Sequence, residues 1–248
     1  GLKVGSAHDA GAMTGVTVIR PDARSVAAVA VAGGGPGTRE TDALAPDTLV
    51  DAIDALVFSG GSVYGLAAAD GVVAALGAAG QGFALVPNSA VPRSPVVPAA
   101  ILYDLANAGN KAWGETPPYR SLGMSALKSV GSQFALGRAG AGYGARAGTA
   151  PGGLGSASIA TDDGIVVGAL AAVNAFGAVM MPGTDVYWAW PYEQIHEFGG
   201  KRPPAGFTLD LDDWGAAKAN PATHGQPVAG RTNTTLACVA TNVALTPA

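Results

Sequence analysis

Two threonines near the end of the chain stand where a hydroxyl can act as a nucleophile. Thr234 and Thr235 follow a short polar segment typical of a turn and precede residues 236–239, which favour a strand. A threonine hydroxyl needs a base, and a chain cut before Thr234 would supply one: its new α-amino group, with an ordinary pKa of roughly 7.7–8.0. The bond between Asn233 and Thr234 is therefore a candidate for self-cleavage. The structural alternative is that both threonines are there only because threonine favours β-strands.

A strand, a glycine turn and a helix follow one another in the first third of the chain. The pattern predicts a strand over residues 54–59, a turn at Gly60-Gly61-Ser62 and an alanine-rich helix over 67–78. We expect Ser62 to cap the helix, whose free N–H groups attract anions or carbonyl oxygens. The spacing differs from that of a Gly-x-Ser-x-Gly nucleophile turn, so Ser62 is not the expected nucleophile.

The remaining elements alternate between strands and a second helix. Strands are predicted over residues 25–32, 82–87 and 99–105, hairpins over 2–20 and over 159–173 with an Asp-Asp-Gly turn, a helix over 121–135, and irregular chain over 180–230. Alternating strands and small-residue helices around a glycine-rich core indicate an α/β fold.

Several polar or glycine-rich positions have both a structural and a functional interpretation. Tyr103 is either a core tyrosine or a hydroxyl that faces a reacting group, and Asn174 is either a turn former or an amide donor. The glycine run 137–148 either packs tightly or forms a wall of a cleft. In the charged loop 37–42, Arg39 either pairs with a neighbouring acid, Glu40 or Asp42, or faces a substrate.

Composition excludes several classes of protein. Of 248 residues, 48% are hydrophobic and only 13% are charged, and the net charge of −4 argues against nucleic acid as a partner. The sparse charge suggests a surface partly buried in an oligomer. No apolar run of about 18 residues and no signal peptide is found, so no membrane and a cytoplasmic location are expected. Cys238 is the single cysteine and reads as a buried thiol, and His196 and His224 lack ligand spacing, so neither metal nor cofactor is expected.

The chain resembles a self-processing hydrolase family through several separate motifs. They are Gly-Thr-Arg-Glu-Thr-Asp at 37–42, Gly-Gly-Ser-Val-Tyr-Gly-Leu-Ala-Ala-Ala-Asp-Gly-Val at 60–72, Ala-Val-Asn at 172–174, and Asn-Thr-Thr with Thr-Asn-Val-Ala-Leu-Thr-Pro at 233–247. Members include L-aminopeptidase/D-esterases, β-peptidyl aminopeptidases and nylon-oligomer (6-aminohexanoate oligomer) endo-hydrolases.

The resemblance implies an αββα sandwich of stacked sheets flanked by helices. It also implies a precursor that cuts itself before Thr234, which leaves a large part, residues 1–233, and the start of a small part, residues 234–248. Thr234 would be the catalytic N-terminal nucleophile, with the Tyr103 hydroxyl and the Asn174 amide at the oxyanion. The cleaved small subunit would stay as a partner in a homo-oligomer, a tetramer by resemblance.

Two departures from the family pattern bear on function. The family commonly carries a catalytic lysine where this chain has Thr149-Ala150-Pro151, and its acidic segment after the nucleophile is not in this sequence, so we expect the small part to be truncated. The expected function is a self-cleaving amidohydrolase or aminopeptidase for small amides or peptides. The alternatives are a nylon-oligomer endo-hydrolase, an acyltransferase that resembles ornithine acetyltransferase, and a non-catalytic remnant.

Overall fold

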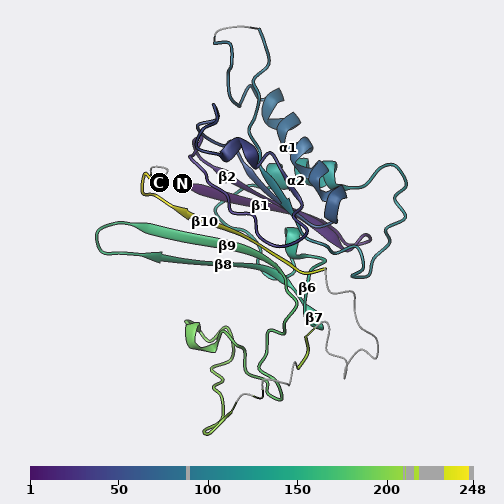
Figure 1. The fold of residues 1–248 in the computed structure, drawn as a ribbon, viewed down its shortest axis with the longest axis vertical. Helices are drawn as coiled ribbons and strands as arrows, with labels where there is room; N and C mark the ends of the chain where they lie inside the picture. The colour runs from purple at the N-terminus through teal and green to yellow at the C-terminus, as the bar shows by residue number, and fades with distance from the viewer. Residues whose placement is uncertain (88–89, 209, 211–214, 218–231, 246–248) are drawn as a thin grey trace.

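Two stacked sheets with helices on one outer side make up the fold, as a computed structural model shows it (Figure 1). The structure describes residues 1–248 except 88–89, 209, 211–214, 218–231 and 246–248. Among the described residues, no helix has both the length and the apolar character needed to span a bilayer.

The first sheet has five strands in the order β1-β2-β4-β5-β3. Its strands are β1 (Leu2–Asp9), β2 (Thr14–Pro21), β3 (Thr38–Arg39), β4 (Leu56–Ser59) and β5 (Ala99–Ile101). β1 and β2 form the predicted hairpin, and only β4 and β5 run parallel. Because side chains alternate along a strand, Val57 of β4 packs in the core under the helices while Phe58 packs in the core between the sheets.

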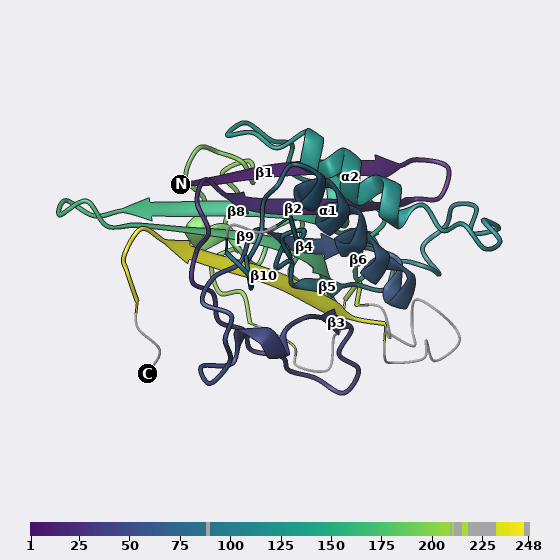
Figure 2. The same cartoon turned by 90° about the horizontal axis from the view of Figure 1, so that it is seen from above.

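Two helices, α1 (Ala67–Ala78) and α2 (Tyr119–Lys128), cover the outer face of this sheet (Figure 2). They approach closely because glycines stand at their contact. A Cβ at Gly71 would overlap the carbonyl of Arg120, and a Cβ at Gly123 would overlap that of Ala68. Small residues at the contact therefore let the two helices pack closely. Short 3-10 turns complete the helical structure: η1 (Asp42–Leu44), η2 (Ser62–Leu66), η3 (Gly140–Gly142) and η4 (Trp190–Tyr192).

The second sheet is antiparallel, with the order β10-β9-β8. Its strands are β8 (Gly153–Ala160), β9 (Val166–Asn174) and β10 (Thr234–Thr241), and a small hairpin of β6 (Arg146–Ala147) and β7 (Ala150–Pro151) lies near its end. Leu170, Ala172 and Leu236 face the first sheet and share a core with Phe58 and Leu102. The stacked-sheet α/β class is thus confirmed, with both described α-helices on the same side of the sandwich.

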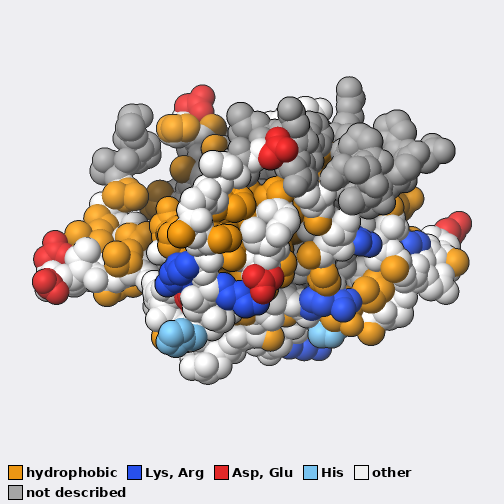
Figure 3. Space-filling model, turned by 90° about the horizontal axis from the view of Figure 1, so that it is seen from below, with side chains coloured by type: hydrophobic (Ala, Val, Ile, Leu, Met, Phe, Trp, Pro, Cys, Tyr) orange, Lys and Arg blue, Asp and Glu red, His pale blue; other side chains and the backbone are white. Residues whose placement is uncertain are grey.

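The outer face of the second sheet carries small and apolar residues. Ile159 and Val239 are exposed there, at 66% and 71%. Figure 3 shows hydrophobic side chains gathered over the middle of the molecule's lower face, which includes this sheet. Within the segment 180–230, which was predicted to be irregular, the described residues 180–208 contain one 3-10 turn, η4, and a bridge between Met180 and Tyr187. Most of residues 209–230 lie outside the described residues.

Four local predictions were wrong: two strands, the bounds of the second helix and one helix cap. Residues 25–32 and 82–87 form no strand: Ser25 and Phe83 each make a single isolated bridge, and Val26, which a paired strand would have buried, is 69% exposed. The second helix begins at Tyr119 and ends at Lys128, because residues 130–131 leave the helix to meet β1 through Val4. Ser62 does not cap α1, since the glycine turn continues into η2 and no side-chain cap bond forms.

Candidate active site

Thr234 is the first residue of β10 and pairs with Asn174, the last residue of β9. The antiparallel register places the two residues opposite each other at the end of the sheet, close to β6 (Figure 1). Thr234 is half-buried, whereas Thr235 is exposed on the other face of the strand. The prediction that Thr234 or Thr235 opens a strand is confirmed, with Thr234 as the first residue, while most of the polar segment predicted as a turn before it lies outside the described residues.

The side chain of Asn174 joins three separate segments around this point. It is fully buried, and its Nδ2 donates hydrogen bonds to the carbonyl oxygens of Thr232, at 2.8 Å, and Tyr103, at 2.9 Å. Its Oδ1 accepts a hydrogen bond from the backbone N–H of Arg146, at 2.9 Å. Asn174 thus ties the residues before Thr234 to the end of the first sheet and to the β6–β7 hairpin.

Asn233 lies between Thr232, whose carbonyl bonds to Asn174, and Thr234, which pairs with Asn174. Its side-chain Oδ1 is buried and has no hydrogen-bond partner among the described residues. A buried amide oxygen without a donor costs about 1–3 kcal/mol, so the residue before Thr234 is held at a free-energy cost. The predicted cleavage point therefore coincides with an unsatisfied polar group.

Tyr103 belongs to a segment that follows β5 and is fastened to the glycine turn. Leu102 donates its N–H to the carbonyl of Ser59, and its own carbonyl accepts the N–H of Ser62. The Tyr103 carbonyl bonds to Asn174, and its side chain is half-buried. The structure thus brings Tyr103, Asn174 and Thr234 together, while the role of the Tyr103 hydroxyl stays a prediction.

The glycine turn itself has an unusual backbone. Gly61 has a φ of +82° and Ser62 a φ of +52°, and a left-handed conformation is costly for a residue with a Cβ. Only glycine fits at position 61, because a Cβ there would overlap the ring of Tyr119. Such strain persists only where the surroundings enforce it, and it is frequent at functional sites.

Asp104 is a buried acid beside the site that the sequence patterns did not predict as part of it. It is fully buried, and it accepts hydrogen bonds from the Thr14 hydroxyl and the Gly61 N–H, both at 2.7 Å. Burial raises the pKa of Asp104, which those two bonds and the nearby Lys111 partly offset. Its position directly after a buried strand, in Ile-Leu-Tyr-Asp, was the available sequence signal.

The glycine run 137–148 packs tightly in one part and adjoins the candidate site in another, while its role as a wall of a cleft stays a prediction. Gly140 and Gly142 are buried in η3, where the N–H of Ala141 bonds to Thr17 of β2, so this part packs between the sheets. Further along, Arg146 bonds to Asn174, so that part adjoins the candidate site.

The cations near the site are held by their own neighbours. Arg39 lies 3.8 Å from Asp70 of α1 instead of pairing with Glu40 or Asp42, which corrects that prediction. The reason is the turn at Glu40, which has a φ of +58° and whose carboxylate accepts the N–H of Val97. The Arg146 side chain donates a hydrogen bond to the carbonyl of Thr149, at 2.7 Å. Arg146 therefore places a cation on the β6–β7 hairpin, beside residues 149–151, where the family commonly has a lysine.

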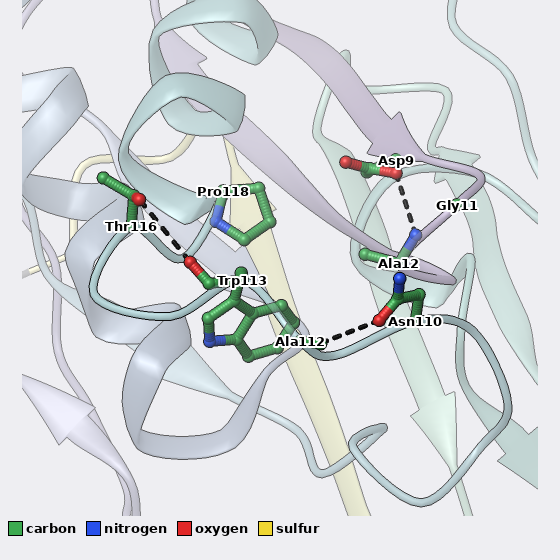
Figure 4. A pocket seen from close by; sticks show the side chains of 8 residues that line it. All are labelled: Asp9, Gly11, Ala12, Asn110, Ala112, Trp113, Thr116 and Pro118. Carbon is green, nitrogen blue, oxygen red and sulfur yellow. Dashed lines mark hydrogen bonds between the residues drawn. The ribbon is translucent and has the colours of Figure 1, made fainter.

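A pocket of about 340 Å³ lies between the turn of the β1–β2 hairpin and the loop before α2 (Figure 4). Its wall includes the Trp113 ring, which makes edge contacts with Tyr64 and Tyr119 at 5.7 Å. Asp9 accepts the N–H of Ala12. The lining contains none of the predicted catalytic residues, being Asp9, Gly11, Ala12, Asn110, Ala112, Trp113, Thr116 and Pro118.

The structure places Cys238 where a reactive thiolate is disfavoured. Cys238 packs against the core between the sheets, and burial raises the pKa of its thiol, which disfavours a thiolate nucleophile. Within the described residues, no group of three His, Cys, Asp or Glu side chains is placed to hold a metal ion. His224 lies outside the described residues.

Known proteins share both the sequence pattern and the fold. The model of peptidase family S58 matches residues 1–248. An uncharacterized aminopeptidase of Mycobacterium bovis is 41% identical over 240 residues, which are 96% of this chain and 64% of that protein. A 6-aminohexanoate-oligomer endohydrolase of Agromyces sp. is 30% identical over 255 residues, covering 100% of this chain and 63% of its own.

A solved structure agrees with the architecture. The L-aminopeptidase D-Ala-esterase/amidase of Ochrobactrum anthropi, described as a variant of the Ntn hydrolase fold, superposes with a TM-score of 0.55 at 21% identity. The match covers 75% of this chain and 54% of that one. The likeness supports the stacked-sheet fold. The chain spans about 64% of the length of the mycobacterial relative. From the family match over its whole length, this chain belongs to peptidase family S58.

Proposed function

We propose that the protein is a self-processing amidohydrolase or aminopeptidase whose nucleophile is Thr234, freed as a chain start by cleavage after Asn233. One observation carries the proposal: Thr234 is paired with Asn174, whose buried amide bonds to the carbonyls of Thr232 and Tyr103. Membership of a peptidase family and the similarity to an aminopeptidase and to an oligomer endohydrolase support it.

Self-cleavage of the chain would need no reactant other than water. The Thr234 hydroxyl oxygen attacks the carbonyl carbon of Asn233, and the hydroxyl proton passes to the amide nitrogen as the C–N bond breaks. The product is an ester between Asn233 and the Thr234 oxygen, with a free α-amino group on Thr234. Water then hydrolyses the ester and leaves a carboxylate on Asn233.

Turnover would use the same hydroxyl on a substrate amide. The α-amine of Thr234 takes the hydroxyl proton as the oxygen attacks, and the proton then goes to the departing amine. Water hydrolyses the resulting acyl ester with the α-amine again acting as the base. The rate should therefore rise with pH through the pKa of that amine, roughly 7.7–8.0 when unperturbed.

The amide of Asn174 is suited to a change of partner during maturation. In the intact chain one of its bonds goes to the carbonyl of Thr232, two residues before Thr234. We propose that, once the new carboxyl end moves away, this N–H turns to the oxyanion of the substrate. The Tyr103 hydroxyl is the second proposed donor.

The two parts would stay associated after the cut. β10 pairs with β9 over its full length from Thr234 to Thr241, so cleavage leaves the nucleophile in the sheet. We also propose a homo-oligomer, a tetramer by family resemblance, because the exposed face of the second sheet bears uncharged residues such as Ala157, Ile159 and Val239.

The expected substrates are small amides, N-terminal peptide bonds or ω-amino-acid oligomers. The nearby walls offer small residues and aromatics, and the named arginines are engaged by the protein itself. An endo-hydrolase of 6-aminohexanoate oligomers is the second candidate, which the similarity to the Agromyces enzyme favours.

A substrate panel tests the proposal, with the protein expressed from its complete gene and a Thr234→Ala variant as the blank. It contains an amino-acid p-nitroanilide, a β-peptide, a 6-aminohexanoate oligomer and casein. Release of only the first residue supports an aminopeptidase, and internal cleavage of the oligomer supports the second candidate. Casein as the best substrate contradicts both. Transfer of the acyl group to an added amine in preference to water indicates an acyltransferase, and inactivity on every substrate a non-catalytic remnant.

A further inference from the structure

Three segments that adjoin the candidate site meet at one buried carboxyl group, that of Asp104. One carboxylate oxygen accepts the N–H of Gly61 in the glycine turn, and the other accepts the hydroxyl of Thr14 at the start of β2. The glycine run touches the same group, because a Cβ placed on Gly144 would lie 2.7 Å from the Asp104 oxygen.

The neighbours of the Asp104 carboxyl group leave no free space around it and link it to Asn174. A Cβ on Gly60 would overlap the Asp104 carboxylate, so a larger residue there would displace it. The backbone of the preceding residue, Tyr103, accepts the amide of Asn174, which also holds the residue two before Thr234. Two hydrogen bonds and the peptide bond between Tyr103 and Asp104 therefore connect Gly61 to Asn174.

We propose that Asp104 is a positioning residue for the Thr234 site. It fixes the backbone of Tyr103 between the glycine turn and β2, and through Tyr103 it sets the orientation of the Asn174 amide. This inference rests on the proposed function, because it concerns the same nucleophile and the same oxyanion donor.

A carboxylate suits this place better than an uncharged side chain of the same shape. Both of its donors, a hydroxyl and a backbone N–H, bond more strongly to a charged acceptor. The titratable groups that face it are the Lys111 ammonium from the loop before α2 and the Tyr119 hydroxyl from α2. Lys111 itself bonds to the carbonyls of Ala12 and Met13, so its charge is fixed near the start of β2.

The test replaces Asp104 by asparagine and compares it with a matched acid near the opposite end of the same sheet. Asp54 is also buried and accepts a backbone N–H, that of Val96 at 2.8 Å, but it lies before β4, whereas the Gly60 turn follows that strand. Asp104→Asn should lower kcat about 10- to 100-fold with KM changed less than about 3-fold, since a misplaced catalytic group costs turnover more than binding. Asp54→Asn should leave both constants within about 2-fold.

A second variant and a second measurement keep the test decisive. Thr14→Val removes the hydroxyl that donates to Asp104 and should lower kcat in the same direction by a smaller factor. Nuclear magnetic resonance of the Asn174 side-chain amide should show a shift in Asp104→Asn and none in Asp54→Asn.

The outcomes separate this inference from the proposed function. A wild-type protein that neither splits nor hydrolyses amides defeats the function, yet the Asn174 signal still reports whether Asp104 sets its position. An active wild type with equal kcat in the two asparagine variants, or an unmoved Asn174 signal in Asp104→Asn, overturns the role of Asp104.

Discussion

Asn174 and Thr234 face each other across strands β9 and β10, and the Asn174 side chain reaches past Thr234 to bond to the carbonyl of Thr232. The donor thus holds the chain just before the expected nucleophile. Because the same side chain also bonds to Tyr103 and Arg146, its removal affects three segments at once.

Replacement of Asn174 should cost both turnover and stability. Asn174→Ala should lower kcat roughly 100- to 1000-fold, as loss of one oxyanion donor does, and lower the free energy of unfolding by about 1–3 kcal/mol through its lost hydrogen bonds. Asn242 is the control, since it bonds to Val166 and Gly164 at the other end of the same sheet. Asn242→Ala should keep kcat, and near-normal turnover in Asn174→Ala would return Asn174 to the role of a turn former.

Replacement of Thr234 by alanine should abolish cleavage and activity, whereas the same replacement of Thr235 should affect neither. Thr234→Ala should give one uncut chain without amidase activity, because both steps use the same hydroxyl, whereas Thr234→Ser should retain cleavage. Thr235 points to the exposed face of β10, so Thr235→Ala should be cleaved and active. Gel electrophoresis with an amidase assay reads both results, and cleavage of Thr234→Ala at this bond would exclude Thr234 as the nucleophile.

The raised pKa of Asp104 should make the free energy of unfolding depend on pH in the acidic range. Burial raises its pKa above the ordinary 3.8, so the folded state binds this proton more tightly than the unfolded chain does. Its contribution to the free energy of unfolding is therefore full below the ordinary pKa and is lost as pH rises through the raised value.

Urea unfolding of wild type and Asp104→Asn over this acidic range checks the sign. The free energy of unfolding of the wild type, minus that of the variant, should fall as pH rises and then stay level. Asp22 and Asp163 have lowered pKa values and give the opposite slope, but they act equally in both proteins and cancel. A difference that rises with pH would contradict the burial of Asp104 as its dominant influence.

The glycine turn should tolerate no side chain at Gly61. Gly61→Ala combines an overlap with the Tyr119 ring and a positive φ, and should lower the free energy of unfolding by about 2–5 kcal/mol. Gly80 has a φ of +69° with open space around it, so Gly80→Ala should show only the backbone cost, about 1–2 kcal/mol. Equal losses in a thermal or chemical melt would show that the contact with Tyr119 contributes nothing.

Sequence patterns predicted the elements whose side chains alternate or whose turns have a clear chemistry. The hairpin through Asp162-Asp163-Gly164 and the helix over 67–78 were confirmed because Gly164 takes a φ of +86° and because the small residues of α1 pack against α2. Residues 25–32 were not predicted correctly, since β propensity does not show whether a neighbouring strand is there to pair with.

The site was predicted in part. The family resemblance, more than any local pattern, pointed to Tyr103 and Asn174, and the structure brings them together with Thr234. Asp104 and the Arg39–Asp70 pair depend on contacts between residues distant in sequence, 90 positions apart for Asp104 and Thr14, which no local pattern contains.

The central claim is that the chain is cut between Asn233 and Thr234, and intact-mass spectrometry of the protein expressed from its complete gene tests it most directly. The account predicts two fragments whose masses place the break after Asn233, with Edman degradation of the smaller beginning Thr-Thr-Leu-Ala, and a single mass for Thr234→Ala. A single uncut wild-type chain, or a new N-terminus at any other residue, would contradict it.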